Sequence, residues 1–366
     1  MHIFDHGGVR LDRYFSNEAS KSVVLNTYLA DKANNILIEN PTNQELNYSS
    51  ISSKFQDKGW EAGFYFFRDA TVRGSGFVIQ SGNIVDAPDL IPSYIRDQIE
   101  RQDRWDLIGE RLEPIQFEDP LVSCMSDGHR IYGHWIVDIL PRVWFYKNFF
   151  GREFSNTKYV FPLDTPQFAR SILQNFFDID AKSIINYDVT RQDIKASKLI
   201  VPSLMHVDHF FYNIVNHFVS YVVGKCSKMK SKDDIDYGQK IYVSRRKFRE
   251  SSESYMRSIS NEEEIEDLIS KEGFSIIFPE DYSWEDQIKI FSNADVIVGE
   301  AGSGLHNAIF SDFGTTVICI NPINQVQGTI AGLRRQNIAY LKEDGDCAAR
   351  KVNSQRLKLA LKYKFD

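Results

Sequence analysis

Two patterns of hydrophobic and polar positions follow one another along the chain. Between residues 63 and 85, β-branched and aromatic runs are broken by glycine-containing turns at 73–76 and 81–83, as in consecutive hairpins. Further along, apolar runs of strand length alternate with segments whose apolar positions have helical spacing. This alternation predicts parallel strands with helices on the faces of a sheet. We therefore expect an α/β protein with an N-terminal β-hairpin elaboration.

The elements of the first half are predicted from this spacing, and Pro141 predicts a bend in the helix that contains it. The predicted helices are 93–104, 134–150, 165–177 and 209–223, and the predicted strands are 121–125, 159–163 and 197–204.

The second half alternates more cleanly and predicts a doubly wound domain. Asn261 with Glu264, and Ser283 with Asp286, have the spacing of helix-capping pairs. The predicted strands are 240–246, 274–278, 295–299 and 315–320, and the predicted helices are 261–273, 283–294 and 305–310.

The polar, non-periodic stretch 228–239 is the predicted linker between two domains. The expected ranges are an N-terminal domain over 1–228 and a C-terminal domain over 229–345. Residues 346–366 are expected to form a basic helix that packs on its Leu/Ala stripe, with a return to the N-terminal domain as one arrangement.

Composition and charge exclude several classes of protein. The 366 residues include 43 Lys and Arg against 50 Asp and Glu, and the net charge of −7 argues against broad binding to nucleic acid. The four cysteines lack the spacing of zinc ligands and are expected to be buried, free thiols. The chain starts without a signal-peptide pattern, and no stretch reaches the roughly 18 apolar residues of a membrane span. We therefore expect a cytoplasmic protein.

The sharpest candidate site is the glycine turn within residues 295–310. There a buried strand leads into Gly302, Ser303 and Gly304, which open a predicted helix and expose backbone N–H groups that can bind an anion. In a doubly wound sheet, this turn lies at the carboxyl ends of the strands, where ligands bind. The third glycine and the later acidic residue of a dinucleotide fingerprint are missing. We expect a phosphate site, although two glycines can also serve close helix–strand packing alone.

Two neighbouring arginines end the first strand of the same domain. An arginine at this place can pair bidentately with a diphosphate. Neighbouring residues on an extended chain face opposite sides, so only one of them is expected to bind. We expect Arg245 to be the binding residue and Arg246 to be a surface residue.

The segment 132–142 carries the candidate chemistry of the first half. His134 and Asp138 are four residues apart and share a face of the predicted helix, so that an imidazole and a carboxylate can deprotonate a hydroxyl together or singly. A core or capping histidine tied to a carboxylate is an equally good interpretation. Trp135 and Arg142 are acceptor-side candidates, with burial in the core as the simpler interpretation of the tryptophan.

No metal site is expected. His206 and His209 lack further ligands, so we interpret them as part of a solvated loop or helix start. Pairs of the D-x-D type can hold a divalent cation, but here both occur in polar turn or linker sequence and are interpreted as surface charge. These pairs are Asp178/Asp180 and Asp234/Asp236.

The motifs together resemble glycosyltransferase family 61. In the first half these are the run FRDATVRGSGFVIQSGNIV and the block HW…D.LPR at 134–142. In the second half they are, in order, YVSRR, RSISNE from Arg257, the helix with Gln287 and Phe291, NADVIVG and GSGLHNAIF. The likeness covers about residues 60–320, and the ordered succession is more specific than any one motif.

This resemblance implies a GT-B architecture, in which two Rossmann-like domains face a cleft, and an inverting transfer without an essential metal or other cofactor. The nucleotide-sugar donor is then expected on the domain 229–345 and the glycan acceptor mostly on 1–228. The donor diphosphate would lie on the 302–304 turn and Arg245. Asp138 or His134 would deprotonate the acceptor hydroxyl, and which of the two is the base stays open.

The turn departs from the family pattern at one position. Many members carry histidine before the glycines, as in H-G-A-G-L, where this chain has Ala301. The role of that histidine is not carried over to this chain. Glu300 or His306 is a candidate to substitute for it, and Asn307 is a further donor-binding candidate.

Two other functions remain open from the sequence. An NAD-dependent sugar epimerase or dehydrogenase also uses strand–glycine–helix geometry, but the full fingerprint is missing. A catalytically inactive glycan-binding or scaffold domain fits the missing turn histidine. For an active transferase, synthesis of a surface polysaccharide such as capsule or lipopolysaccharide is expected, with the basic C-terminal helix as a candidate for peripheral contact with the inner face of the membrane.

Overall fold

The computed structural model describes residues 20–26, 34–38, 61–101, 104, 106–107, 112–150, 157–207, 210–229, 237–251, 259–320, 325–342, 344–345 and 350–362. They form two compact units, which are described separately. The first consists of strand β1 and residues 61–214, and the second of strand β2 and residues 215–362. Within these ranges, none of the helices combines the length and the apolar character that a bilayer crossing requires.

The first unit is built on a mixed sheet with the strand order β5-β4-β3-β10-β7-β8-β9, to which β1 adds beside β3 and β6 beside β10. The antiparallel pairs β3–β4 and β4–β5 confirm the predicted hairpins. Strands β10, β7, β8 and β9 are parallel. The bounds are β1 Ser20–Asn26, β3 Glu61–Arg73, β4 Phe77–Gln80, β5 Asn83–Ile84, β6 Ile115–Phe117, β7 Leu121–Val122, β8 Lys158–Pro162, β9 Ile184–Tyr187 and β10 Ile194–Pro202.

A helical stretch with a π-helical turn carries the 132–142 motif. It consists of α2 (Tyr132–His134), the π turn η2 (Trp135–Ile139) and α3 (Leu140–Phe150). The N–H of Leu140 bonds the carbonyl oxygen of Trp135, five residues back, directly before Pro141. Proline lacks the backbone N–H that a regular helix needs, and both prolines and π-helical turns are recognised causes of a bend in a helix. The other helices are α1 Ser93–Glu100, α4 Gln167–Ser171, the π turn η3 Ile172–Phe176 and the 3₁₀ helix η4 Ala181–Ser183.

The helix predicted over 209–223 begins too early. Strands β11 (His206–Val207) and β12 (Phe210–Phe211) form an antiparallel hairpin, and α5 runs only from Val215 to Cys226. The consecutive aromatic residues at 210–212 carry no helical period, so they fit a short strand as well as a helix. As a result, His206 lies on a strand rather than in a solvated loop or helix start.

The second unit has an all-parallel sheet of order β14-β13-β15-β16-β17-β2. Strands β13 to β16 confirm the predicted alternation, whereas β17 and β2 were not predicted. Strand β2 comes from the expected N-terminal domain but pairs with β17, because an open sheet edge accepts any segment that offers its backbone. The bounds are β2 Asn34–Ile38, β13 Lys240–Val243, β14 Ser275–Ile277, β15 Val296–Glu300, β16 Thr316–Ile320 and β17 Asn337–Leu341.

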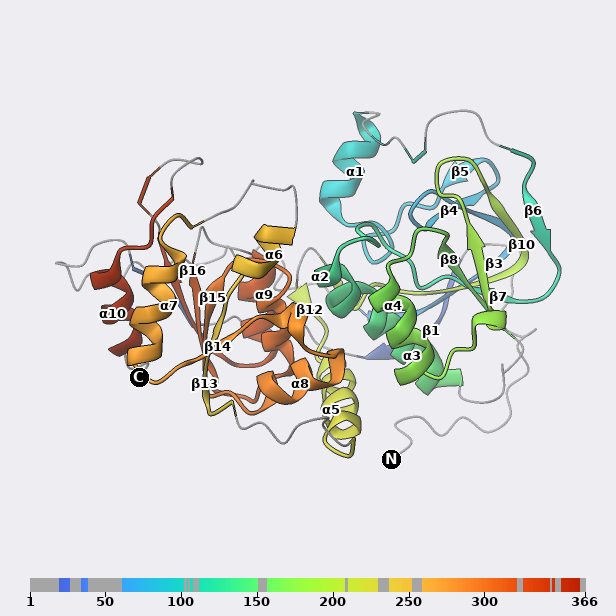
Figure 1. Ribbon diagram of the computed structural model, residues 1–366. Coiled ribbons are helices and arrows are strands. Elements are labelled where there is room, and N and C mark those ends of the chain that lie inside the picture. The colour runs from blue at the N-terminus through green and yellow to red at the C-terminus, as the bar shows by residue number, and fades with distance from the viewer. Residues whose placement is uncertain are drawn as a thin grey trace. The chain divides into compact units, whose positions relative to one another are not determined.

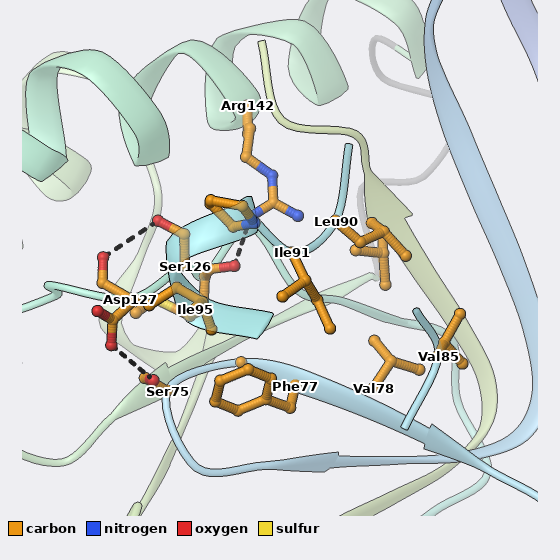
Figure 2. Close-up of a pocket in the computed structure, with 14 residues that line it drawn as sticks. Ser75, Phe77, Val78, Val85, Leu90, Ile91, Ile95, Ser126, Asp127 and Arg142 are labelled. Atoms are coloured by element: carbon orange, nitrogen blue, oxygen red, sulfur yellow. Dashed lines mark hydrogen bonds between the residues drawn. The ribbon is translucent and has the colours of Figure 1, made fainter. Parts of the chain in front are cut away.

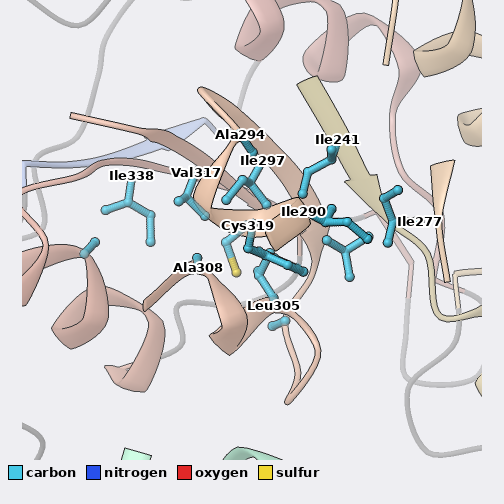
Figure 3. Packing of buried hydrophobic residues seen from close by; sticks show 14 of the residues in the cluster. Ile241, Ile277, Ile290, Ala294, Ile297, Leu305, Ala308, Val317, Cys319 and Ile338 are labelled. Atoms are coloured by element: carbon cyan, nitrogen blue, oxygen red, sulfur yellow. The ribbon is translucent and has the colours of Figure 1, made fainter. Parts of the chain in front are cut away.

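Successive residues of these buried strands face two different apolar cores. Ile297 and Val317 pack with residues of α8 and the 3₁₀ helix η6 (Figure 3), whereas Val298 and Ile318 pack with α7 and α10. Figure 1 shows α7 and α10 on one side of the sheet and α8 and α9 on the other. The unit is therefore a three-layer α/β/α structure. The helices are α6 Arg246–Ser251, α7 Glu262–Lys271, η5 Pro279–Asp281, α8 Trp284–Ser292, η6 Leu305–Phe310, α9 Gln325–Leu333 and α10 Ser354–Lys362.

The two predicted capping pairs differ in outcome. The hydroxyl of Ser283 accepts a hydrogen bond from the N–H of Asp286 at 3.1 Å, which confirms the first turn of α8. Asn261 stands at the N-cap position of α7, but its side chain bonds both the N–H and the carbonyl oxygen of Val352. The main chain before α10 thus satisfies the amide that was expected to cap α7.

Two expected boundaries differ from the observed units. Helix α5 packs on α8 and η6, with Phe218 against Phe310, so the division falls before Val215 rather than after 228. Leu357 and Ala360 of α10 are buried in the α7-side core of the second unit, rather than returning to the first. The Leu/Ala stripe is the face that packs, as its spacing predicted. The linker stretch lies largely outside the described residues.

Three of the four cysteines are buried and free, as predicted: Cys124, Cys226 and Cys319. Burial raises the pKa of Cys124 to about 12, so this thiol is not reactive at neutral pH. Cys347 lies outside the described residues.

Candidate functional site

The candidate site of the first unit lies at the carboxyl ends of two neighbouring parallel strands, β7 and β10. Val122 is paired with Ile200, and the N–H of Ser123 bonds the carbonyl oxygen of Ile200 at 3.0 Å. From there, the chain after β7 leads to α2, and the chain after β10 leads to β11. Parallel strands end at the same edge of a sheet, so these two distant segments meet there.

Three side chains form a hydrogen-bonded row at this edge. Nδ1 of His134 lies 2.5 Å from Oδ2 of Asp138, and Nε2 of His206 lies 2.7 Å from Oδ1 of the same carboxylate. The side chains of Asp138 and His206 are 9% and 7% exposed, whereas that of His134 is 30% exposed. His134 is therefore the member of the row that a substrate can reach.

The contacts determine the protonation of the row. Burial alone would raise the pKa of Asp138, but hydrogen bonds from His134 and His206, with their charges, lower it well below its usual value. Burial alone would lower the pKa of His134, but the hydrogen bond and charge of Asp138, assisted by the charge of Asp127, raise it above its usual 6.5. An ionised carboxylate only accepts, so Nδ1 of His134 and Nε2 of His206 are both donors. Neutral His134 consequently keeps its free electron pair on Nε2.

Gly128 leaves the space in which the ring of His134 lies. It has a φ of +79°, a conformation that favours glycine. A Cβ atom added at Gly128 would lie 2.2 Å from Cδ2 and 2.7 Å from Nε2 of His134. Any larger residue must therefore displace either the loop or the imidazole.

The two acceptor-side candidates are buried. Trp135 is fully buried, its indole N–H donates to the carbonyl oxygen of His129 at 2.6 Å, and its ring packs on Phe161. The guanidinium of Arg142 donates to the carbonyl oxygens of Met125 and Pro202. The structure thus places both in the protein interior, where Arg142 joins the segment that follows β7 to the last residue of β10.

A small cavity lies beside the loop that leads to Gly128. It has a volume of about 30 Å³ and is lined by Ser126, Asp127 and Arg142 together with apolar side chains of β4 and α1. Figure 2 shows the Arg142 side chain pointing toward Ile91 in this space. The volume suffices for one or two water molecules.

The candidate site of the second unit lies where the strand order reverses. The chain passes from β13 to β14 on one side, and then to β15 on the other side of β13. In open α/β sheets, ligands bind at such a switch point, outside the carboxyl ends of the strands. Arg245 follows β13 and Gly302 follows β15, so both lie at this point.

The structure brings together Arg245 and the glycine turn. Nη1 of Arg245 donates to the carbonyl oxygen of Ala301 at 3.2 Å, and a Cβ atom at Gly302 would lie 3.0 Å from this nitrogen. Gly302, Ser303 and Gly304 are each partly exposed. The helix after the turn is the six-residue 3₁₀ helix η6 and not an α-helix. Its macrodipole is correspondingly small, so Arg245 supplies the main positive charge of the turn.

Buried acidic residues bind the segment that begins at Ser244 and contains Arg245. The hydroxyl of Ser244 donates to Glu266 at 2.7 Å and lies 3.1 Å from Oε1 of Glu262, and the N–H of Arg245 donates to Glu262 at 3.1 Å. Arg246, expected to be a surface residue, has a side chain that is 37% exposed and that forms an ion pair of 2.9 Å with Glu266. The two arginines do point to different partners, as the extended chain predicted.

The remaining donor-binding candidates are buried. Glu300 accepts a hydrogen bond from Arg249 at 3.0 Å, and the side-chain amide of Asn307 donates to Gln287 at 2.8 Å. His306 is 9% exposed within η6. Glu300 and Asn307 are thus engaged with side chains behind the turn, so Arg245 and the turn itself are the exposed parts of the site.

No group of three or more His, Cys, Asp and Glu side chains suited to a metal ion occurs in the described part of the chain. Asp178 and Asp180 are exposed, and Asp180 caps the short helix η4 by accepting from the N–H of Lys182. Asp234, Asp236, His209 and Arg257 lie outside the described residues.

His206 and Gly128 were not predicted as parts of the site. One signal was present for His206: it stands just after a predicted strand, at the end where parallel sheets place their ligands. Gly128 follows the preceding strand β7 in the same manner. Neither signal is strong without the knowledge that β7 and β10 are neighbours.

Comparison with known proteins adds one finding to this geometry. None of the curated proteins matches the chain. The family model Glycosyltransferase 61 matches residues 132–318, half of the chain, and this range spans both candidate sites from Tyr132 to β16. Membership of this family implies the transfer of a sugar from a donor to an acceptor. The chain belongs to the glycosyltransferase 61 family.

Proposed function

We propose that the protein is an inverting glycosyltransferase that moves a sugar from a nucleotide-diphosphate donor to a hydroxyl of a glycan. The observation that carries the proposal is the position of Arg245 and the glycine turn at the switch point of a parallel sheet, in a chain of this family. A partly exposed guanidinium beside small residues suits a diphosphate, which needs charge and close backbone approach.

In this proposal, the first unit binds the acceptor and His134 is the catalytic base. Both oxygens of Asp138 accept hydrogen bonds and its pKa is lowered, so this carboxylate is a poor base. His134 combines a raised pKa with partial exposure and a free electron pair on Nε2. Asp138 is then a positioning residue that keeps the proton on Nδ1.

The proposed step is a single displacement. Nε2 of His134 takes the proton of the acceptor hydroxyl while the hydroxyl oxygen bonds the anomeric carbon. The bond between that carbon and the diphosphate oxygen breaks, and the nucleoside diphosphate leaves with its electron pair. Arg245 stabilises the charge that develops on this leaving group. Attack opposite the leaving group inverts the anomeric centre.

Several finer assignments belong to the same proposal. The two units would be the two halves of a GT-B enzyme, and the reaction would need no metal. Surface polysaccharide synthesis is the proposed pathway, and the basic helix α10 is the proposed place of any peripheral membrane contact. Lys358 and Lys362 on the exposed side of α10 support this last point.

The proposal is tested by nucleotide binding to the full chain. A panel of nucleoside diphosphates without metal, with NAD as a comparison, is added in thermal melts. The cognate nucleotide at 100 times its Kd should stabilise by about 2.7 kcal/mol, or roughly 5–10 °C. Arg245→Ala should weaken this binding by roughly 10- to 100-fold, because a hydrogen bond to a charged group contributes about 1.5–3 kcal/mol.

Arg246→Ala is the matched control, since it removes the same group from the neighbouring position that faces Glu266. It should leave nucleotide affinity nearly unchanged. Stabilisation by NAD with no response to any nucleoside diphosphate would contradict the donor assignment and favour a dehydrogenase or epimerase. Binding of nucleotide without transfer to any glycan in a donor and acceptor screen would favour an inactive binding domain.

A further inference from the structure

His206 supports the buried carboxylate from the side opposite to the proposed base. Its Nε2 lies 2.7 Å from Oδ1 of Asp138, while Nδ1 of His134 uses Oδ2. The two histidines are far apart in sequence, since His206 and Asp138 are separated by 68 residues. Each oxygen of the carboxylate thus has its own donor, and the donors come from different elements.

The fold holds the ring of His206 firmly in this position. Its side chain is 7% exposed, and the residue is paired with Phe211 across the β11–β12 hairpin. The two rings meet edge to face, with 5.7 Å between their centres. The hairpin starts directly beyond the end of β10, where the guanidinium of Arg142 bonds the carbonyl oxygen of Pro202. The ring is therefore held by the β11–β12 hairpin rather than by the helix that carries Asp138.

A carboxylate held through one oxygen can rotate about its last bond, and its second oxygen then competes for the same donor. A second donor on the other oxygen removes this freedom. It also keeps Asp138 ionised in a buried place, where an unsatisfied carboxylate oxygen is costly. The orientation of Asp138 in turn decides which nitrogen of His134 carries the proton.

We propose that His206 is a positioning residue for the transfer reaction, which through Asp138 holds neutral His134 in the Nδ1–H tautomer with Nε2 free to accept a proton. This inference rests on the proposed function for its kinetic consequences. Its structural consequence, the tautomer of His134, does not depend on which sugar is transferred.

The kinetic test compares a variant that keeps the donor with variants that lose it. His206→Gln places an amide N–H near the position of Nε2 but carries no titratable group. His206→Leu removes the donor, and His206→Phe removes it while keeping a ring against Phe211. We expect the two donorless variants to lower kcat by roughly 10- to 100-fold, as is typical for residues that orient a reactive group. The KM for the donor sugar should change little, and His206→Gln should recover most of kcat.

A second readout is independent of activity. Nitrogen-15 NMR of the histidine side chains in the full chain reports the tautomer of His134, assigned with a His134→Gln spectrum. The wild type and His206→Gln should show the Nδ1–H form. His206→Leu and His206→Phe should show a mixture that contains the Nε2–H form.

The outcomes separate the two proposals. The positioning role is overturned if the tautomer of His134 is unchanged in both donorless variants. It is also overturned if the Gln, Leu and Phe variants melt like the wild type and lose kcat equally. If the wild type transfers no sugar from any donor, the proposed function fails, and the NMR comparison still decides the role of His206. If Leu and Phe variants do not fold, a wild-type spectrum with the Nε2–H form of His134 overturns the inference, and the Nδ1–H form retained in His206→Gln supports it.

Discussion

The two candidate sites are built in contrasting ways. The His134 site depends on a row of buried side chains, in which the hydrogen-bond partners of one carboxylate come from two separate segments. The Arg245 site consists of a partly exposed turn and one long side chain that donates to the turn itself. A row of buried, hydrogen-bonded side chains suits a reactive group whose position must be held to a fraction of an ångström. A partly exposed turn with one arginine suits the binding of a charge. Changes at the first site should therefore act on kcat, and changes at the second on affinity.

The largest effect is expected from removing the base. His134→Ala should lower kcat by roughly 10²- to 10⁴-fold with nucleotide affinity retained, because general base catalysis contributes about that much. Asp138→Asn should also lower kcat strongly, because an amide no longer holds the Nδ1–H tautomer. Steady-state kinetics with the cognate donor and acceptor measure both. His217→Ala, at an exposed position of α5, is the matched control and should be neutral. Near-wild-type turnover in both site variants would refute the assignment of the base.

Two glycine substitutions sharpen the comparison. Gly128→Ala forces a Cβ atom within 2.2 Å of the His134 ring at a φ of +79°, and should lower kcat roughly 10²-fold, the loss expected for a displaced reactive group. Gly302→Ala meets only the flexible end of Arg245, 3.0 Å away, and should weaken nucleotide binding by less than about tenfold. Kinetics and nucleotide titrations on samples with checked melting curves measure the two effects. The reverse pattern, in which Gly128→Ala reduces affinity and Gly302→Ala reduces kcat, would contradict the division of roles.

The smallest effect is a shift in pH dependence. The base must be unprotonated, so kcat should rise with pH through the pKa of His134 and then level off. This midpoint should lie above 6.5, because the hydrogen bond and charge of Asp138 outweigh the lowering effect of burial. Below the midpoint, the rate should fall about tenfold per pH unit. In Asp138→Asn, the residual activity should have a lower midpoint, since the carboxylate that raised the pKa is gone. A rate that falls as pH rises through this range would exclude His134 as the base.

Several features of both units followed from local sequence. The apolar runs at 295–299 and 315–320 predicted the buried strands β15 and β16, and the strand–turn–helix order placed the glycine turn beside Arg245. The spacing of His134 and Asp138 predicted their hydrogen bond, which the structure shows at 2.5 Å. In each of these cases the decisive residues lie within one element or at the end of neighbouring elements.

Other features had no local signal. The segment predicted to start a helix at 209 instead contributes strand β12 to a hairpin, because its consecutive aromatic residues do not distinguish a short strand from a helix. Trp135 is an interior residue, as its simpler interpretation predicted, whereas nothing in the spacing told that Arg142 is buried as well. The π turn before Pro141 changes which face of the helix meets the sheet, and it was not predictable from a period of 3.6.

The sequence by itself determined the α/β class, the glycine turn with its arginine, and the imidazole–carboxylate pair, because periodicity, capping and i,i+4 spacing act between residues close in the chain. Only the tertiary structure decided that β7 lies beside β10, that β2 joins the second sheet, and that His206 and Gly128 lie against the pair formed by His134 and Asp138. Strand order depends on which distant segments bury their apolar faces together, and that choice is made by the free energy of the whole fold rather than by any local pattern.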